Sequence, residues 1–269
     1  MGSWKQLSPS ALHRLDLGLA YGLTDVGTVR ESNQDNFFID PDIGLVVVAD
    51  GMGGHEAGEI ASADAIKLLH HFIRASRGGQ QDAPNDASDA TMRAMVTLHD
   101  AVEFANGHVY QANVANGQAD GAGMGTTLTG MWQAAQDGPA FIFHVGDSRL
   151  YRFRQGRLNQ LTRDQSLYQQ ALEAGMPEPL PARNLLLQAI GPAPLVKPDL
   201  QTQAIAPGDV YLLCSDGLYG NSSPQAIAAI LARVRDDNLG PCCAELVAMA
   251  KRDGSRDNIT AVIVRCKDA

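Results

Sequence analysis

Short apolar runs separated by polar turn residues occupy much of the sequence, and this pattern is typical of β-strands. The run at 45–49 is apolar at every position, which predicts a strand that is buried on both faces. A turn at 41–44 is expected to join it in a hairpin to a strand at 36–39. Further strands are expected at residues 17–23, 126–133, 140–145, 149–154, 210–214 and 259–266.

Other stretches place their apolar residues on one face of a helix. Helices are expected at residues 56–75, 90–115, 164–174, 224–234 and 241–251. The last two begin with proline, which suits the first turn of a helix. A polar loop is expected at residues 76–88, and the proline-rich part of the segment 164–198 predicts a loop or a mobile flap.

The order of these elements lacks the regular strand–helix alternation of a doubly wound parallel sheet. It favours an α+β sandwich in which two mainly antiparallel sheets are covered by helices, a four-layer α-β-β-α arrangement. No linker or internal repeat divides the chain. We therefore expect a loose N-terminal leader over residues 1–16 and a single domain over 17–269, with the flap at about 164–198.

The composition is that of an ordinary soluble domain, with 269 residues, 45% hydrophobic and 19% charged. The net charge of -9 argues against nucleic acid as a partner, because phosphate backbones are repelled unless cations intervene. Four cysteines without a CxxC pair predict reduced core thiols. No signal peptide or apolar run of about 20 residues is visible, so we expect a cytoplasmic protein that does not enter a membrane.

Five aspartates stand at or beside the ends of apolar runs, next to Gly, Ser or Asn. They are Asp35, Asp50, Asp147, Asp216 and Asp257. A lone aspartate in such a place is usually a turn residue or a helix cap. Five of them together predict one oxygen-rich site, and hard cations such as Mg²⁺ and Mn²⁺ prefer carboxylate and carbonyl ligands.

The segment around Asp50 and the position of Arg30 add two details to this site. A carboxylate that follows a buried strand is costly unless it is paired or bound to a metal, and Gly51 lets a backbone carbonyl approach an ion closely. Arg30 is a candidate anion ligand, because a guanidinium can hold a phosphate with two parallel hydrogen bonds.

Six short motifs resemble those of the metal-dependent protein phosphatases, the PPM or type-2C serine/threonine phosphatases, in their bacterial form. The motifs stand in the family's order at residues 30–35, 50–54, 123–127, 145–149, 215–217 and 257–260. The resemblance covers roughly residues 17–266. It implies a β-sandwich flanked by helices, with a two-metal centre in the cleft between the sheets.

The resemblance also implies a role for each candidate residue. Asp50 would bridge two metal ions, with Asp216 and Asp257 completing the first site and the Gly51 carbonyl serving the second. The residues expected to act near the second site through water are Gln34 and Asp35.

A weaker third ion would be held by Asp147 and Asp216, and Arg30 would hold the substrate phosphate. The ions would be Mn²⁺ or Mg²⁺, and a water bridging two of them would attack phosphorus. The implied substrates are phosphoserine and phosphothreonine proteins, including a bacterial Hanks-type kinase and its targets. We expect a monomer.

Three positions depart from the family pattern or leave a role open. Met52 stands where eukaryotic relatives carry a histidine proposed as the general acid, and either His55 or a metal-bound water could replace it. Gln34 replaces a glutamate and removes one negative charge from the second metal site. Gln165 stands where relatives often have histidine, a change that bears on substrate choice more than on the core reaction.

The sequence leaves two other functions open. One is a catalytically silent phosphoprotein-binding module on the same fold, although the retained aspartates argue against it. The other is a small-molecule phosphatase, because the flap and the cleft rim set substrate choice. A nucleophilic serine is disfavoured, since neither Ser148 nor Ser215 has a suitable base nearby in sequence. His144, inside an apolar strand, is expected to be a core histidine.

Overall fold

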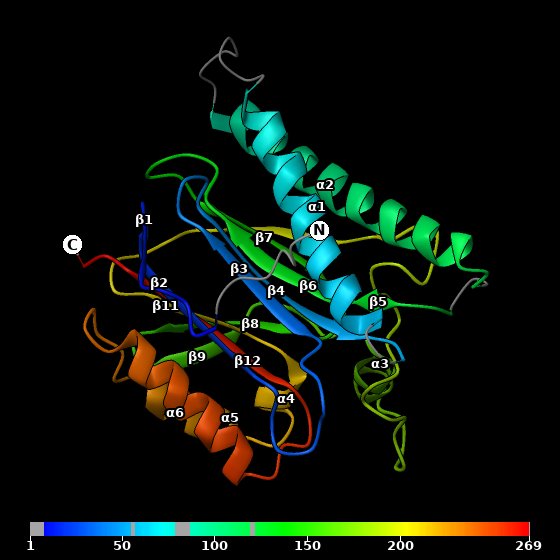
Figure 1. Ribbon diagram of the computed structural model, residues 1–269. Helices are drawn as coiled ribbons and strands as arrows, with labels where there is room; N and C mark the ends of the chain where they lie inside the picture. The colour runs from blue at the N-terminus through cyan, green and yellow to red at the C-terminus, as the bar shows by residue number, and fades with distance from the viewer. Residues whose placement is uncertain (1–7, 55–56, 79–86, 119–121, 269) are drawn as a thin grey trace.

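Two antiparallel sheets face each other, and helices cover the outer face of each (Figure 1). The computed structural model describes residues 8–54, 57–78, 87–118 and 122–268. The first sheet contains, in spatial order, β1 (His13–Leu15), β2 (Gly18–Asp25), β12 (Ile259–Cys266), β11 (Val210–Cys214), β8 (Arg149–Arg154) and β9 (Arg157–Gln160). The second contains β10 (Asp199–Gln203), β7 (Ala140–Val145), β6 (Leu128–Trp132), β4 (Leu45–Met52) and β3 (Asp35–Asp40), with β5 (Gly125–Thr126) paired to β4.

The helices form the two outer layers. Against the second sheet lie α1 (Ala57–Gly78) and α2 (Ala87–Ala115), whereas α5 (Pro224–Leu231) and α6 (Leu239–Arg252) cover the first sheet. Two short helices, α3 (Leu167–Glu173) and α4 (Asp216–Tyr219), lie in the connections. The prediction of a four-layer α-β-β-α sandwich is therefore confirmed.

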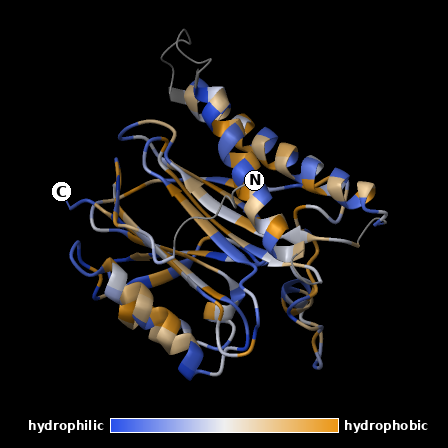
Figure 2. Ribbon diagram, in the orientation of Figure 1, coloured by the Kyte–Doolittle hydropathy of each residue, from blue (hydrophilic) through white to orange (hydrophobic). Residues whose placement is uncertain are grey.

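The central strands are buried on both faces, as their apolar sequences predict. In β4, Leu45 and Val47 pack against the helices, while Val46 and Val48 pack between the sheets. Every residue of β12 is buried in the same alternating way. Figure 2 shows hydrophobic residues along the strands of both sheets and mixed faces on the covering helices. Burial of this apolar surface, at roughly 25 cal/mol per Å², is the main force that holds the four layers together.

The prediction of a loose leader is wrong for residues 8–15. β1 pairs with β2, with His13 opposite Ala20, and Leu15 is buried between the sheets. The Ser10 amide also donates to the Gly22 carbonyl at 2.9 Å. Backbone hydrogen bonds to the edge of a sheet hold this segment although its sequence carries little apolar periodicity. Residues 1–7 lie outside the described residues.

Other differences concern short or polar elements. β10 and α4 were not predicted. The sequence of β10 is half polar, and this strand is ordered by five residue pairs with β7. α1 ends at Gly78 rather than at 75, α2 already includes Ala87 rather than beginning at 90, α5 ends at Leu231 rather than at 234, and α6 begins at Leu239 rather than at 241. Residue 56, where the first helix was expected to begin, lies outside the described residues. The helix expected at 164–174 exists as α3, but it begins only at Leu167, after residues 164–166, and is capped by the Ser166 side chain.

Within the flap segment, residues 174–198 form turns and isolated bridges rather than regular strands or helices. Ser166, near the start of the flap segment, and Leu186, in its later part, form an antiparallel bridge. In the described part of the chain, no helix combines the length and the apolar character needed to cross a membrane.

Candidate metal centre

The predicted site residues meet at one pocket of about 240 Å³ between the two sheets. Seven of them line it: Arg30, Gln34, Asp50, Gly51, Asp147, Asp216 and Asp257. The eighth, Asp35, is 1% exposed and lies beside the pocket, opposite Asp50 in the β3–β4 register. Segments that are far apart in sequence therefore supply one cluster of carboxylates.

Strands β3 and β4 of the second sheet contribute the first part of the site. The Asp50 backbone is fixed by Thr127, whose Oγ1 accepts from the Asp50 amide at 2.9 Å and whose own amide donates to the Asp50 carbonyl. At Gly51 a Cβ atom would lie 2.0 Å from the Gly58 carbonyl oxygen and 2.6 Å from that of Gln34. Only glycine fits there, because the start of α1 and the Gln34 loop approach the strand so closely.

The first sheet contributes Asp216, just after β11, and Asp257, just before β12. Asn258 ties this side of the pocket to the segment that carries Arg30 and Gln34. Its Oδ1 accepts from the Gln34 amide at 2.9 Å, and its Nδ2 donates to the Ser32 carbonyl, also at 2.9 Å. One asparagine thus fixes the two sides of the cleft against each other.

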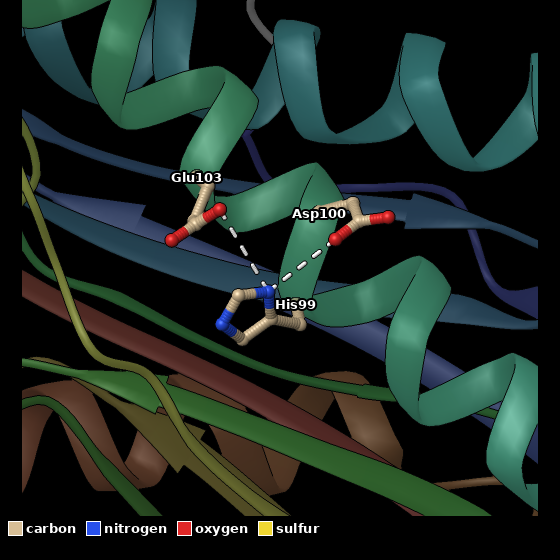
Figure 3. Close-up of side chains that lie close together, drawn as sticks. All are labelled: His99, Asp100 and Glu103. Carbon is tan, nitrogen blue, oxygen red and sulfur yellow. Dashed lines mark hydrogen bonds and ion pairs between the residues drawn. The ribbon is translucent and has the colours of Figure 1, made fainter.

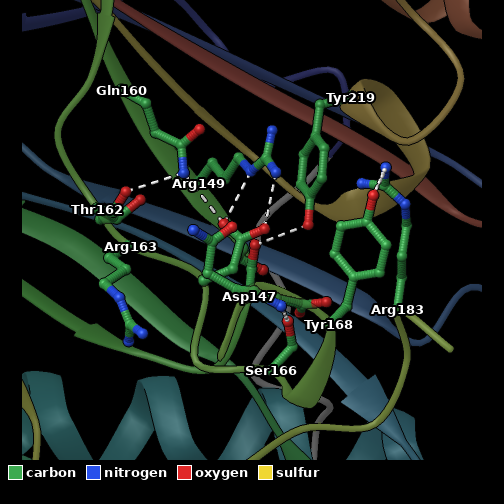
Figure 4. A network of polar contacts seen from close by, with 12 residues as sticks. Asp147, Arg149, Gln160, Thr162, Arg163, Ser166, Tyr168, Arg183 and Tyr219 are labelled. Atoms are coloured by element: carbon green, nitrogen blue, oxygen red, sulfur yellow. Dashed lines mark hydrogen bonds and ion pairs between the residues drawn. The ribbon is translucent and has the colours of Figure 1, made fainter. Parts of the chain in front are cut away.

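Asp147 lies in the connection between β7 and β8, where the chain crosses from the second sheet to the first. Its side chain is part of a largely buried polar region (Figure 4). The Tyr219 hydroxyl donates to the Asp147 carbonyl at 2.9 Å, and the Arg149 guanidinium stacks over the Tyr219 ring. Arg149 in turn makes a two-bond ion pair with Asp164.

Burial and repulsion from neighbouring aspartates raise the pKa values of four of these carboxyl groups, those of Asp35, Asp50, Asp147 and Asp216. Desolvation is the largest cause for each of the four, and at Asp35 hydrogen bonds from the Ser215 and Thr260 hydroxyls act in the opposite direction. The pKa rises to about 6 for Asp216, about 7 for Asp35 and about 8 for Asp147, and it rises well above the usual range for Asp50. Such a cluster is costly when ionised unless cations neutralise it. An all-oxygen donor set of this kind fits Mg²⁺ or Mn²⁺.

Arg30 is the cation that lines the pocket. Its guanidinium donates to the Asp257 carboxylate at 2.8 Å, and this hydrogen bond is the main reason that its pKa is raised. The side chain is 51% exposed, so it stands at the mouth of the pocket rather than inside it. The guanidinium carries five N–H donors, and one bond to Asp257 leaves others for an oxyanion.

Several residues that contact the candidate site residues or line the pocket have roles that the sequence does not indicate. Asp35 accepts hydrogen bonds from the Ser215 hydroxyl at 2.6 Å and from the Thr260 hydroxyl at 2.7 Å. Ser215 and Thr260 belong to motifs already singled out, but their contact with Asp35 needs the fold. Asn184 and Leu186 of the flap segment also line the pocket, and no local pattern marks them.

Other candidate groups have structural explanations. Ser215 is fully buried and bonded to Asp35, which agrees with its exclusion as a nucleophile. His144 is a core histidine, as predicted, with hydrogen bonds to Thr129 and to the Arg163 carbonyl. A separate group, His99 with Asp100 and Glu103, lies on α2 outside the pocket (Figure 3). All three come from one helix face in contact with solvent, where such clusters are commonly just solvated.

A family model described as protein phosphatase 2C matches residues 28–239. The chain belongs to this family. It is 35% identical over 251 residues to protein phosphatase PhpP of Streptococcus pneumoniae, which covers 90% of this chain and 95% of PhpP. Bacterial phosphatases of the PPM type are thus its relatives, as the motifs predict.

Two further comparisons involve the phosphatase PstP. The serine/threonine protein phosphatase PstP of Mycobacterium tuberculosis is 34% identical over 265 residues, which is 95% of this chain but only 46% of PstP. The chain therefore spans less than half the length of that relative. A crystal structure of the PstP catalytic domain in complex with two manganese ions superposes with a TM-score of 0.75 and 31% identity, covering 93% of this chain and 98% of that one.

Proposed function

We propose that this chain hydrolyses phosphoserine and phosphothreonine residues of proteins in a reaction that depends on divalent metal ions. The observation that carries the proposal is the gathering of Asp50, Asp147, Asp216 and Asp257 with Arg30 around one pocket. Raised carboxyl pKa values and an oxygen-only donor set support a cation site rather than an acid–base pair.

The residues divide by role. Asp50, Asp216 and Asp257 would hold two ions together with the Gly51 carbonyl, and Gln34 and Asp35 would act on them through water. Asp147, with Asp216, would hold a third and weaker ion. Bound divalent ions supply an activated water nucleophile and positive charge that offsets the phosphoryl oxygens. In an acidic protein this positive charge also makes a phosphorylated substrate acceptable.

Arg30 binds the substrate phosphate. Its bond to Asp257 orients the guanidinium toward the pocket, while its exposure lets it meet a phosphate that enters from solvent. Charge-assisted bonds of this kind stabilise the equatorial oxygens during transfer. Met52 lines the pocket but has no proton to donate to the leaving group. His55, the other sequence candidate for that role, lies outside the described residues.

Serine/threonine phosphoproteins as substrates are supported by the names of the relatives, PhpP and PstP, which are called protein phosphatases. The physiological role that follows is to reverse the action of a serine/threonine kinase, with the enzyme acting as a monomer. This role would be supported if the enzyme released phosphate from a kinase-phosphorylated protein much faster than from phosphorylated metabolites. Equal or faster turnover of metabolites would favour a small-molecule phosphatase.

The test is hydrolysis of a phosphothreonine peptide with and without Mn²⁺. We expect turnover that EDTA abolishes, and loss of turnover in Asp50→Asn. The matched control is Asp237→Asn, which removes one exposed carboxylate outside the pocket and leaves activity unchanged. Absence of EDTA-sensitive hydrolysis in the wild-type protein would exclude the proposal and, if Mn²⁺ still binds, favour a silent phosphoprotein-binding module.

A further inference from the structure

Gln165 is a buried residue at the base of the flap segment, and it makes four hydrogen bonds to three different parts of the fold. Its side-chain Oε1 accepts from the Gly146 amide at 2.9 Å, and its Nε2 donates to Asp199 Oδ2 at 3.0 Å. Its own amide donates to the Gly146 carbonyl at 2.8 Å, and its carbonyl accepts from the Leu187 amide at 2.7 Å. Gln165 is 4% exposed, and its side-chain bond to Gly146 is shielded from water, whereas its bond to Asp199 is partly buried.

The side-chain bonds require one acceptor and one donor at fixed positions. A backbone amide can only donate, so Gly146 needs the acceptor, whereas a carboxylate can only accept, so Asp199 needs the donor. The uncharged amide of glutamine supplies both. An aliphatic side chain of similar size would leave the Gly146 amide without its partner in a buried place, which is unfavourable.

Gly146 is the residue immediately before Asp147. It has a φ of 101°, in the region that favours glycine, and a Cβ there would lie 2.7 Å from the Thr127 side chain. Gln165 binds both the amide and the carbonyl of Gly146, while Tyr219 binds the Asp147 carbonyl. The backbone that carries the Asp147 carboxyl group is therefore held on both sides, and Figure 4 shows the Tyr219 side of this arrangement.

The remaining bonds of Gln165 lead into the flap segment and out of it. Leu187, which donates to the Gln165 carbonyl, follows Leu186, a residue that lines the pocket. Asp199 opens β10, where the chain leaves the flap segment. Gln165 thus connects the Asp147 turn to the start of the flap segment, to the stretch around Leu187 and to Asp199 at the end of the segment.

We propose that Gln165 is a positioning residue that couples the flap segment to the Asp147 carboxyl group. It sets where that carboxyl group stands, and so how tightly the weakest divalent ion binds, and it transmits the presence of that ion to the pocket-lining part of the flap. This inference rests on the assignment of Asp147 as an ion ligand in the proposed function. Because coupling between two sites is reciprocal, each side can be measured from the other.

Gln188 provides a matched control within the same segment. Its Oε1 accepts from the Lys197 amide at 2.8 Å and its Nε2 donates to the Lys197 carbonyl at 3.2 Å. Like Gln165 it makes one donor and one acceptor bond, but it contacts neither Gly146 nor Asp199. Gln165→Leu and Gln188→Leu therefore each remove one donor and one acceptor bond of the flap segment, the first with the link to Asp147 and the second at an exposed position without it.

The experiment is calorimetric titration of the purified protein with Mn²⁺, in which Asp147→Asn identifies the weakest binding event by its loss. We expect Gln165→Leu to weaken that event about tenfold, the effect of losing roughly one buried hydrogen bond. Gln188→Leu should change it by less than about twofold, and the tighter events should be unchanged in both variants. Unaltered Mn²⁺ binding in Gln165→Leu, or equal weakening in both variants, would overturn the proposal.

A second measurement covers the case in which Gln165→Leu does not fold. In the wild-type protein, amide hydrogen exchange over residues 181–190 should slow when Mn²⁺ fills the weakest site, and this slowing should be absent in Asp147→Asn. Exchange that does not respond to Mn²⁺, or an Asp147→Asn variant that loses no binding event, would overturn the coupling. Hydrolysis is measured separately, so a protein with this coupling but no phosphatase activity would contradict only the proposed function.

Discussion

Two groups of buried aspartates in this fold are stabilised in opposite ways. Asp164 accepts two hydrogen bonds from Arg149, and Asp209 accepts two from Arg154, with donor–acceptor distances between 2.5 and 2.8 Å. Asp209 also accepts from the Tyr211 hydroxyl. These carboxylates are neutralised from within the protein, in a geometry that offsets the cost of removing charge from water.

The aspartates of the pocket lack such compensation. Burial and repulsion from neighbouring aspartates raise the pKa values of Asp35, Asp50, Asp147 and Asp216, and Arg30 reaches the group only from its exposed edge. An arginine would satisfy these carboxylates as well as it satisfies Asp164. Its absence among the described residues inside the pocket leaves negative charge for an external cation. The difference separates the carboxylates that are paired within the protein from those that remain available to a cation.

The largest effect is expected from Asp216→Asn. Loss of a shared metal ligand should lower kcat/KM by about a thousandfold or more, since the activated water and the phosphoryl charge both depend on the ions. The metal-free variant should nevertheless be more stable than the metal-free wild type at pH 8, because one repelling buried carboxylate is gone. Phosphopeptide kinetics and urea unfolding test the two parts. A variant that is both inactive and less stable would place Asp216 with the structural aspartates.

The opposite outcome is expected from Asp209→Ala. Removing this carboxylate, which is fully buried, leaves Arg154 without its partner and should destabilise the protein by about 3 kcal/mol. Activity per folded molecule should stay the same, because Asp209 is not among the residues of the pocket. Urea unfolding gives both the free energy and the folded fraction under assay conditions. Loss of Mn²⁺ affinity in this variant would break the separation of the two groups.

The stability of the metal-free protein should fall as the pH rises. The carboxyl groups of Asp216, Asp35 and Asp147 have folded-state pKa values raised to about 6, 7 and 8. Their unfolded value is about 3.9, so the folded state binds more protons than the unfolded state across this interval. The stabilisation is complete below about pH 4 and is lost as the pH passes through the folded values. A loss of at least about 2 kcal/mol is expected between pH 5 and 8.

Saturating Mn²⁺ provides the control for this pH dependence. Bound cations replace the protons, so the loss of stability between pH 5 and 8 should largely disappear. Thermal or urea unfolding in EDTA and in Mn²⁺ measures the difference. Equal pH dependence in both conditions would mean that the pocket carboxylates are compensated in some other way.

The smallest effect is expected from Arg30→Ala. Loss of charge-assisted bonds to the substrate phosphate, in the bound substrate and during transfer, should lower kcat/KM by about tenfold. Mn²⁺ binding should change by less than about threefold, because Arg30 contacts Asp257 only at the exposed edge of the cluster. Arg256→Ala, which removes an exposed charge beside Asp257 in sequence, is the matched control. Equal losses in both variants would reduce Arg30 to a source of general positive charge.

The sequence predicted which residues line the pocket better than it predicted the contacts that surround them. Asp50 and Gly51 follow a fully apolar strand, and the costs of burying a carboxylate and of crowding a Cβ explain both residue types locally. The function of Ser215 and Thr260 could not be predicted, because they meet Asp35 from strands that are distant in sequence. Likewise, β10 is too polar to show a periodic pattern and is ordered by β7.

By itself the sequence determined the strands of the core, the four-layer architecture and the residue types of the candidate metal centre, because buried strands and a carboxylate-lined pocket constrain side-chain chemistry position by position. Only the tertiary structure decided which aspartates are paired with arginine and which are left to one another. It also brought Asn184 and Leu186 to the pocket and tied the flap segment to Gly146 through Gln165. These features depend on contacts between distant segments, and compensation of a buried charge is a property of its neighbours in space rather than in sequence.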